Sequence, residues 1–159
     1  MPIPSRLSSY LDQCGARYEV CSHDRSQTSA QTARTAHVEP HRLAKSVLCE
    51  DEHGFVLAVV PADARVSLGA LGQLLGRERL RLCNEDRVAS LFFDCERGAV
   101  PAIGMPWDVE TIVDDDIEMG DEIYIEAGDH KQLLRMPIDH YRNVMRAARH
   151  GRFSKPMKH

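Results

Sequence analysis

AKSVLCEDEHGFVLAVVP, residues 44–61, predicts the centre of a β-sheet. Two short apolar runs, 46–49 and 55–60, flank a polar segment, 50–54, that contains a glycine. This pattern is typical of a β-hairpin. Pro61 ends the second strand, because proline cannot donate a hydrogen bond to a strand ladder. The sequence therefore predicts two neighbouring antiparallel strands in the middle of the chain.

Helices and further strands are predicted on both sides of this hairpin. Apolar residues at helical spacing, together with capping residues, predict helices over 5–14, 26–37, 67–75 and 138–150, and a further helix capped by Asn84. Alternating or β-branched runs predict strands over 17–21, 80–83, 110–113, 122–126 and 132–136. Because helices and strands alternate irregularly and hairpins are frequent, we expect an α+β fold with a mixed, largely antiparallel sheet packed with helices.

Length and composition predict a single domain over residues 1–159, since 43% of the residues are apolar and one sizeable core can form. No apolar run is long enough to span a bilayer, and the first residues lack the apolar centre of a signal peptide. We therefore expect a cytoplasmic protein. Five cysteines without a Cys-x-x-Cys pair, and histidines without helical ligand spacing, predict reduced thiols, no metal site and no cofactor.

Charge is unevenly distributed along the chain. The formal net charge of −4 argues against a surface that coats nucleic acid. After Asp139, however, no acidic residue follows, and a basic C-terminal helix and tail are predicted over 138–159. Its basic residues recur every three or four positions: Arg142, Arg146, Arg149, Arg152, Lys155 and Lys158. This segment could contact RNA, or it could be the solvated face of a helix.

The segment 98–104, GAVPAIG, is a candidate anion-binding loop. Two glycines on either side of a proline can bend the backbone so that successive amide hydrogens point to one place. An ordinary surface loop is the alternative. Lys45 lies directly before an apolar strand, at a predicted helix-to-strand junction, where its stem can be buried and its ammonium group can face a cavity. A solvated surface lysine is the alternative.

Together these segments resemble the YbaK/EbsC family of prolyl-tRNA editing-like domains. The elements that carry the resemblance are His23, the alanine-rich segment 30–36, the Ala-Lys-Ser entry at 44–46, the apolar strand 57–62 and the loop 98–104. They occur in the family's order, and the resemblance extends over about residues 18–136. It implies the family's fold and hydrolysis of the ester that joins a mischarged amino acid to tRNA.

The resemblance also implies roles for individual residues. The catalytic residues would be Lys45, Gly98 and Ala99, with loop amides stabilising the oxyanion and a water molecule, positioned partly by a tRNA ribose hydroxyl, as the nucleophile. The substrate-binding residues would be His23, Thr28, Thr32, Ser46, Val60, Val100, Pro101, Ala102, Gly104 and His130. Mischarged tRNA is the implied partner, with prolyl-tRNA synthetase as a second candidate. Alanyl, cysteinyl and seryl substrates all remain open.

Several alternatives stay open at this point. His23 is better suited to fixing its loop through hydrogen bonds than to catalysis. Thr28 and Thr32 are equally suited to capping or covering a helix, and His130 to an exposed loop. A binding module that recognises aminoacyl-tRNA, an amino acid or a protein without turnover is the second hypothesis. A metal-dependent hydrolase that uses histidines and the acidic run 114–116 is the third.

Overall fold

The computed structural model describes residues 3–26 and 28–157. Its helices are α1 (Ser5–Gln13), α2 (Ser29–Thr35), α3 (Leu68–Leu75), α4 (Glu85–Leu91) and α5 (Ile138–Val144), with short 3₁₀ turns at Pro40–Arg42, Met105–Trp107 and Asp115–Met119. Its strands are β1 (Glu19–Ser22), β2 (Leu43–Asp51), β3 (Gly54–Pro61), β4 (Ala64–Val66), β5 (Arg81–Leu82), β6 (Glu110–Asp114), β7 (Glu122–Glu126), β8 (Gln132–Pro137), β9 (Arg149–Gly151) and β10 (Ser154–Pro156).

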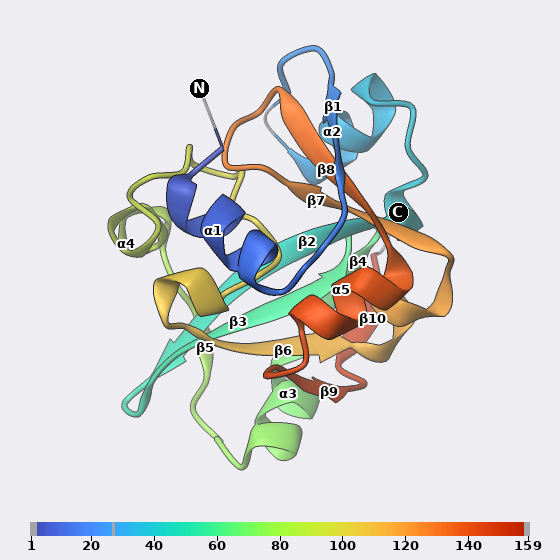
Figure 1. The fold of residues 1–159 in the computed structure, drawn as a ribbon. Helices are drawn as coiled ribbons and strands as arrows, with labels where there is room; N and C mark the ends of the chain where they lie inside the picture. Colours follow the sequence, from blue (N-terminus) through green and yellow to red (C-terminus); the bar gives the residue numbers. More distant parts are fainter. Residues whose placement is uncertain (1–2, 27, 158–159) are drawn as a thin grey trace.

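The main sheet has the strand order β1-β8-β7-β2-β3-β6-β9, and β5 pairs with β2 outside this path (Figure 1). Four of its seven strand pairings involve a strand of the hairpin, β2 or β3. The pairs β2/β7, β3/β6 and β6/β9 are parallel. The other pairs of the sheet, and the small sheet formed by β4 and β10, are antiparallel. The predicted α+β class with a mixed, largely antiparallel sheet is confirmed.

The predicted hairpin forms the middle of the sheet. Strands β2 and β3 pair from Ala44 opposite Pro61 to Asp51 opposite Gly54. Gly54 has a φ angle of 126°, a backbone conformation that residues with a side chain rarely adopt, which explains the glycine at the turn. The hairpin therefore has a register that is fixed at both ends.

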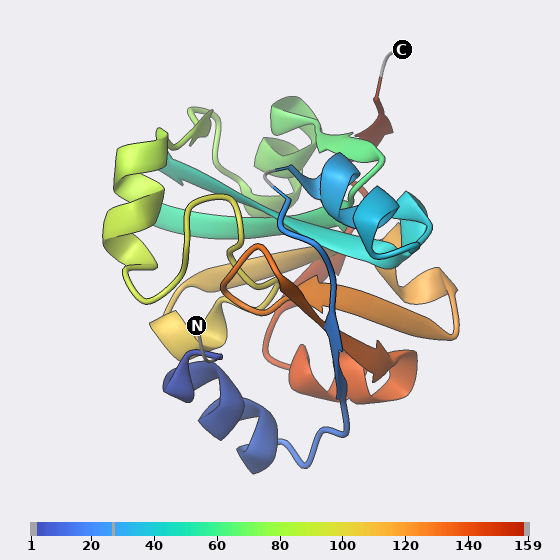
Figure 2. The ribbon, with the colours of Figure 1, turned by 90° about the horizontal axis from the view of Figure 1, so that it is seen from above.

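Helices cover both faces of the sheet (Figure 2). On one face, Leu7 of α1 and Tyr141 of α5 belong to the same buried cluster as Leu57 and Val59 of β3. On the other face, α3 and the C-terminal segment pack against Val56, Ala58 and Val60 of the same strand. This alternation along β3 follows from the two-residue period of a strand, and it explains why the run from 55 to 60 is apolar throughout.

The C-terminal helix is shorter than predicted. Helix α5 ends at Val144, and Arg149–Gly151 forms β9, which pairs in parallel with β6. The edge of β6 offers unpaired backbone groups, and Asp114 accepts hydrogen bonds from the amides of Phe153 and Ser154. These partners favour an extended chain over further helical turns.

The basic residues of this segment therefore do not share one helix face. Arg142 forms an ion pair with Glu118, Arg149 donates to the carbonyl of Leu74, and Arg152 lies near Asp115. Lys158 lies outside the described residues.

The predicted position of Lys45 is also corrected. Lys45 is the third residue of β2 rather than a junction residue, because the strand begins at Leu43. On α3, Leu71 and Gly72 are the buried residues, and Leu74 is 37% exposed.

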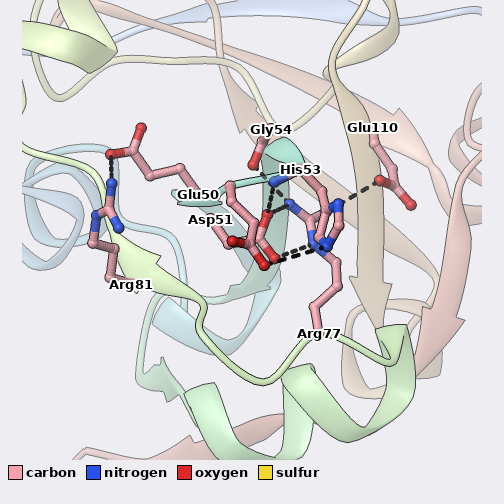
Figure 3. Close-up of polar contacts among 8 residues, drawn as sticks. Glu50, Asp51, His53, Gly54, Arg77, Arg81 and Glu110 are labelled. Carbon is pink, nitrogen blue, oxygen red and sulfur yellow. Dashed lines mark hydrogen bonds and ion pairs between the residues drawn. The ribbon is translucent and has the colours of Figure 1, made fainter.

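A cluster of polar side chains around Arg77 connects the hairpin turn with the end of α3 (Figure 3). The guanidinium group of Arg77 donates to both carboxylate oxygens of Asp51 and, at 2.7 Å, to the carbonyl of Gly54. A weaker contact of 3.4 Å reaches Glu110 on β6. The Arg77 and Asp51 side chains are only 11% and 2% exposed. Arg77 therefore connects three elements through charge-assisted hydrogen bonds.

None of the helices within residues 3–26 and 28–157 combines the length and apolar character that a bilayer span requires.

Candidate active site

The candidate site lies at a gap beside β2. Strand β7 pairs with β2 only at Leu43 and Ala44, and β5 pairs with it only at Cys49 and Glu50. Between these two pairings, residues 45–48 have no strand beside them on that edge in the described chain. A cavity of about 250 Å³ lies next to this gap. Residues from several segments line it, among them Lys45, Ser46, Leu57, Val88, Phe92, Gly98, Val100 and Glu126.

Lys45 lines the cavity with a half-buried side chain. Its Nζ atom donates a hydrogen bond of 2.6 Å to the carbonyl of Ala64 on β4. Burial lowers the pKa of this ammonium group, and the negative charge of Asp63 partly offsets that effect. Because an ammonium group has three hydrogens, two remain available to a ligand. The structure thus holds the ammonium group of a cavity-lining lysine at the carbonyl of Ala64.

The Gly98 loop reaches the cavity from the other side. Gly98 has a φ of 79°, so the turn favours glycine. The Ser46 hydroxyl donates to the carbonyl of Pro101 at 2.9 Å and lies 3.2 Å from the carbonyl of Val100. This contact ties the loop to β2, next to Lys45. Four of the predicted residues, Lys45, Ser46, Gly98 and Val100, are therefore brought to one cavity.

The loop amides differ in their availability. The N–H of Ala99 donates to the carbonyl of Glu96 at 3.1 Å, and Pro101 has no N–H. Ala99 is fully buried, so its predicted catalytic role does not rest on a free amide. Within the described residues, the amides of Gly98 and Val100 donate to no backbone or side-chain acceptor. These two are the candidate donors for an oxyanion.

The second half of the loop anchors it in the core. Ala102 is fully buried, and its carbonyl accepts a 2.9 Å hydrogen bond from the Tyr141 hydroxyl. A Cβ on Gly104 would lie 2.7 Å from the carbonyl of Val109 and would overlap the hydroxyl of Thr111. Glycine is therefore required there by close packing rather than by backbone conformation. Neither Ala102 nor Gly104 lines the cavity.

The two predicted histidines hold neighbouring loops and do not line the cavity. His130 is 6% exposed, so it is not an exposed loop residue. Its backbone N–H donates to Glu96 at 3.1 Å, and its Nε2 contacts the carbonyl of Arg97, just before Gly98. The backbone N–H of His23 donates to the carbonyl of Lys131 at 2.8 Å. Both histidines thus support the loops around the site.

The remaining predicted residues also lie outside the cavity lining. Thr28 caps α2 by accepting a hydrogen bond from the amide of Gln31. Thr32 is fully buried, 2.5 Å from the Ser26 hydroxyl. The side chain of Val60 packs in the cluster on the α3 face of the sheet, because it alternates with Val59 along β3.

Glu126, the last residue of β7, lines the cavity but was not among the predicted site residues. It is 4% exposed, and burial raises the pKa of its carboxyl to about 8. In the sequence it alternates with Ile123 and Ile125, which predicts a solvated face shared with Glu122. Glu126 is buried because segments distant in the sequence cover that end of the strand, so no local signal could have identified it.

Replacing Glu126 with glutamine is expected to stabilise the protein more at alkaline pH than at about pH 5. The raised folded-state pKa means that the carboxyl's contribution to stability is complete below its ordinary pKa of about 4.3. That contribution is lost as pH rises toward the folded-state value, whereas glutamine does not titrate. Melting temperatures at about pH 5 and pH 9 check this, with about 2–4 °C for each kcal/mol. An equal difference in melting temperature at both pH values would contradict it.

Comparisons with known proteins agree with this fold. A family model described as the aminoacyl-tRNA editing domain matches residues 23–144. The search of curated proteins gave no match.

Solved structures with the same fold were also found. Hypothetical protein APE2540 has a TM-score of 0.83 and 20% identity, over 94% of this chain and 99% of that chain. A protein proposed to be a trans-editing enzyme for prolyl-tRNA synthetase has a TM-score of 0.83 and 22% identity, over 98% of each chain. A proposed signal transduction protein from Marinobacter aquaeolei VT8 has a TM-score of 0.77 and 20% identity, but this chain covers only 30% of it.

At these identities the structural similarity shows a shared fold. The family model matches well over half of the chain, and it confirms the family resemblance found in the sequence. The chain belongs to the aminoacyl-tRNA editing domain family.

Proposed function

We propose that this protein is a trans-acting aminoacyl-tRNA deacylase, which hydrolyses the ester between a mischarged amino acid and the terminal ribose of tRNA. The observation that carries the proposal is the shared cavity of the Lys45 side chain and the Gly98 and Val100 segment, whose amides have no partner in the described chain. A volume of about 250 Å³ suits one amino-acid residue. Sites for drug-sized ligands are usually larger, about 300–1,000 Å³.

In this mechanism the ester carbonyl oxygen lies near the amides of Gly98 and Val100. These donors stabilise the negative charge that develops on the oxygen when water attacks. The Lys45 ammonium supplies a positive charge on the opposite side of the cavity, where it binds polar groups of the substrate. The rate acceleration then comes from positioning and electrostatic stabilisation.

A covalent mechanism is not supported by the side chains around the cavity. Burial, with a hydrogen bond to Glu50, raises the pKa of the Cys83 thiol to about 12, so it stays protonated and weakly nucleophilic at neutral pH. The Ser46 hydroxyl is engaged with loop carbonyls. Neither histidine among the predicted site residues lines the cavity. Water is therefore the proposed nucleophile, positioned partly by the ribose hydroxyl of the tRNA.

Deacylation of a panel of charged tRNAs tests the proposal. The panel contains proline tRNA charged with alanine, cysteine, serine and, as the cognate control, proline. The proposed function predicts multiple turnovers on at least one mischarged member and little activity on the cognate one. Tight binding of every tRNA without turnover would instead support the binding-module alternative.

Replacing Gly98 with alanine is expected to slow deacylation by about tenfold or more. A side chain at a φ of 79° costs about 1–2 kcal/mol, and relaxation of that strain would turn the neighbouring amides away from the substrate. The matched control is Gly120→Ala, because Gly120 has a φ of −103° and a Cβ there would meet only a carbonyl at 3.9 Å. Single-turnover rates of both variants provide the measurement. Equal rates for the Gly98 variant and the wild type would remove the loop from the mechanism.

A further inference from the structure

Glu126 is an unusual carboxylate for its surroundings. It lines the cavity that contains Lys45 and the Gly98 loop, yet only 4% of its surface is exposed. Its Oε2 atom is fully buried and has no hydrogen-bond partner within residues 3–26 and 28–157. Buried polar atoms nearly always have a partner, so an unpaired carboxylate oxygen beside a cavity indicates a place for a ligand atom.

The other side of this carboxyl group is held in place. The Thr32 hydroxyl forms a hydrogen bond with the Glu126 carboxyl, and its oxygen lies 2.5 Å from the hydroxyl of Ser26. Thr32 has a single hydroxyl hydrogen, so when it donates to Glu126, Ser26 donates to Thr32. All three residues are buried. This chain of hydrogen bonds fixes the carboxyl group and leaves Oε2 for a ligand.

The charges around Glu126 favour a cationic ligand group. Asp129 acts on it with a like charge, and the exposed Glu85 lines the same cavity. Lys45 lines the cavity too, but its Nζ atom is held at the carbonyl of Ala64. No ion pair with Glu126 occurs among the described residues. A positively charged ligand group beside Oε2 would therefore be stabilised.

We propose that Glu126 binds the α-amino group of the aminoacyl moiety and makes a free α-amine a requirement for substrates. The inference rests on the proposed function, because an aminoacyl ester carries its amine on the carbon next to the reacting carbonyl. A carbonyl held at the Gly98 and Val100 amides thus brings the amine into the same small cavity. A Ser26–Thr32–Glu126 hydrogen-bond chain orients the acceptor for it.

The protonation chemistry agrees with this role. Burial raises the pKa of the Glu126 carboxyl to about 8, close to the ordinary α-amine value of about 7.7–8.0. The amine and the carboxyl can therefore share one proton, and their pair has no net charge in either arrangement. Binding then brings no uncompensated charge into the cavity. An N-acylated amino acid cannot form this pair and leaves the carboxyl without its partner.

Binding of a non-hydrolysable substrate analogue tests the inference. The probes are 3′-(L-alanylamino)-3′-deoxyadenosine and its N-acetyl derivative, whose amide bond replaces the ester. Titration calorimetry compares the wild type, Glu126→Gln and the control Glu85→Gln, which makes the same chemical change at an exposed residue of the same cavity. Thermal melting verifies that each variant is folded.

We expect the wild type and Glu85→Gln to prefer the free amine by at least about tenfold, the scale of one charge-assisted hydrogen bond. Glu126→Gln is expected to lose most of this preference while it still binds the N-acetyl probe like the wild type. A preference that Glu126→Gln retains in full would overturn the inference, as would a wild type that binds both probes equally or binds neither.

The test separates this inference from the proposed function, because probe binding needs no hydrolysis. A wild type that prefers the free amine through Glu126 but deacylates no tRNA would contradict the deacylase and leave the amine site standing. A wild type that deacylates tRNA, with a preference that does not depend on Glu126, would contradict the amine site alone.

Discussion

Replacing Lys45 with alanine is expected to slow deacylation by about 100-fold or more while the protein stays folded. The substitution removes the cation from the cavity, and losing one preorganised electrostatic contact of this kind costs about 10²–10³ in rate. The structural cost is smaller, because the Lys45 ammonium has one protein hydrogen bond, to the carbonyl of Ala64. A hydrogen bond to a charged group contributes about 1.5–3 kcal/mol. Single-turnover rates and melting curves measure the two effects separately.

Two further variants serve as controls for Lys45→Ala. Lys131→Ala removes an exposed lysine outside the cavity and should leave the rate unchanged. Lys45→Arg keeps the charge but replaces a compact ammonium with a planar, longer group, so only partial activity is expected. A rate for Lys45→Ala within about threefold of the wild type would exclude an essential role for this lysine, since that difference is below 1 kcal/mol.

Replacing Arg77 with leucine is expected to lower the free energy of unfolding by about 3–5 kcal/mol, the usual cost of removing one partner from a buried ion pair. Arg77 donates to Asp51 and Gly54 at the hairpin turn, and its removal leaves a carboxylate that is 2% exposed without its main partner (Figure 3). For a chain of this length the melting temperature should fall by about 6–20 °C. Urea unfolding and calorimetry provide the measurement.

The matched control for this variant is Arg81→Leu. Arg81 also forms an ion pair on the same hairpin, with Glu50, but its side chain is 69% exposed. Glu50 is buried but keeps its 2.7 Å ion pair with Arg87 when Arg81 is removed. Ion pairs of exposed side chains contribute about 0–1 kcal/mol, so this substitution should change stability little. Equal losses for the two variants would mean that burial of the Arg77 cluster does not determine its contribution.

The same cluster predicts loss of stability in acid. Hydrogen bonds from Arg77 hold the pKa of Asp51 well below its usual range. A carboxyl with a depressed folded-state pKa contributes stability above its ordinary value of about 3.9, and that contribution is lost as pH falls toward the folded-state value.

The sequence predicted those elements whose residues carry a local signal. The hairpin of β2 and β3 follows from two apolar runs around a glycine turn, and Asn84 and Ser67 cap α4 and α3 as their side chains suggest. The end of α5 could not be predicted in this way. Residues after Val144 have an acceptable helical pattern, but the edge of β6 and the carboxylate of Asp114 offer them better backbone partners.

The residues of the candidate site were likewise predicted only where the sequence carries a local signal. Lys45 and Gly98 were identified because a strand entry and a glycine-proline loop are visible in the sequence. Glu126 was not identified, because its surroundings come from segments that are distant in the sequence. It lies at the gap between the β7 and β5 pairings on β2, next to Thr32 of α2. The difference between Val60 and Leu57 is similar. Both lie in the apolar strand β3, on opposite faces of the sheet. The elements that pack against the sheet determine that Leu57 lines the cavity and Val60 does not.

The most direct test of the central claim is a crystal structure of the protein with 3′-(L-alanylamino)-3′-deoxyadenosine. We predict that the alanyl group occupies the cavity beside Lys45, with its carbonyl oxygen within hydrogen-bonding distance of the Gly98 and Val100 amides. Binding of the alanyl group elsewhere, or with its carbonyl turned away from those two amides, would contradict the assignment of this cavity as the deacylation site.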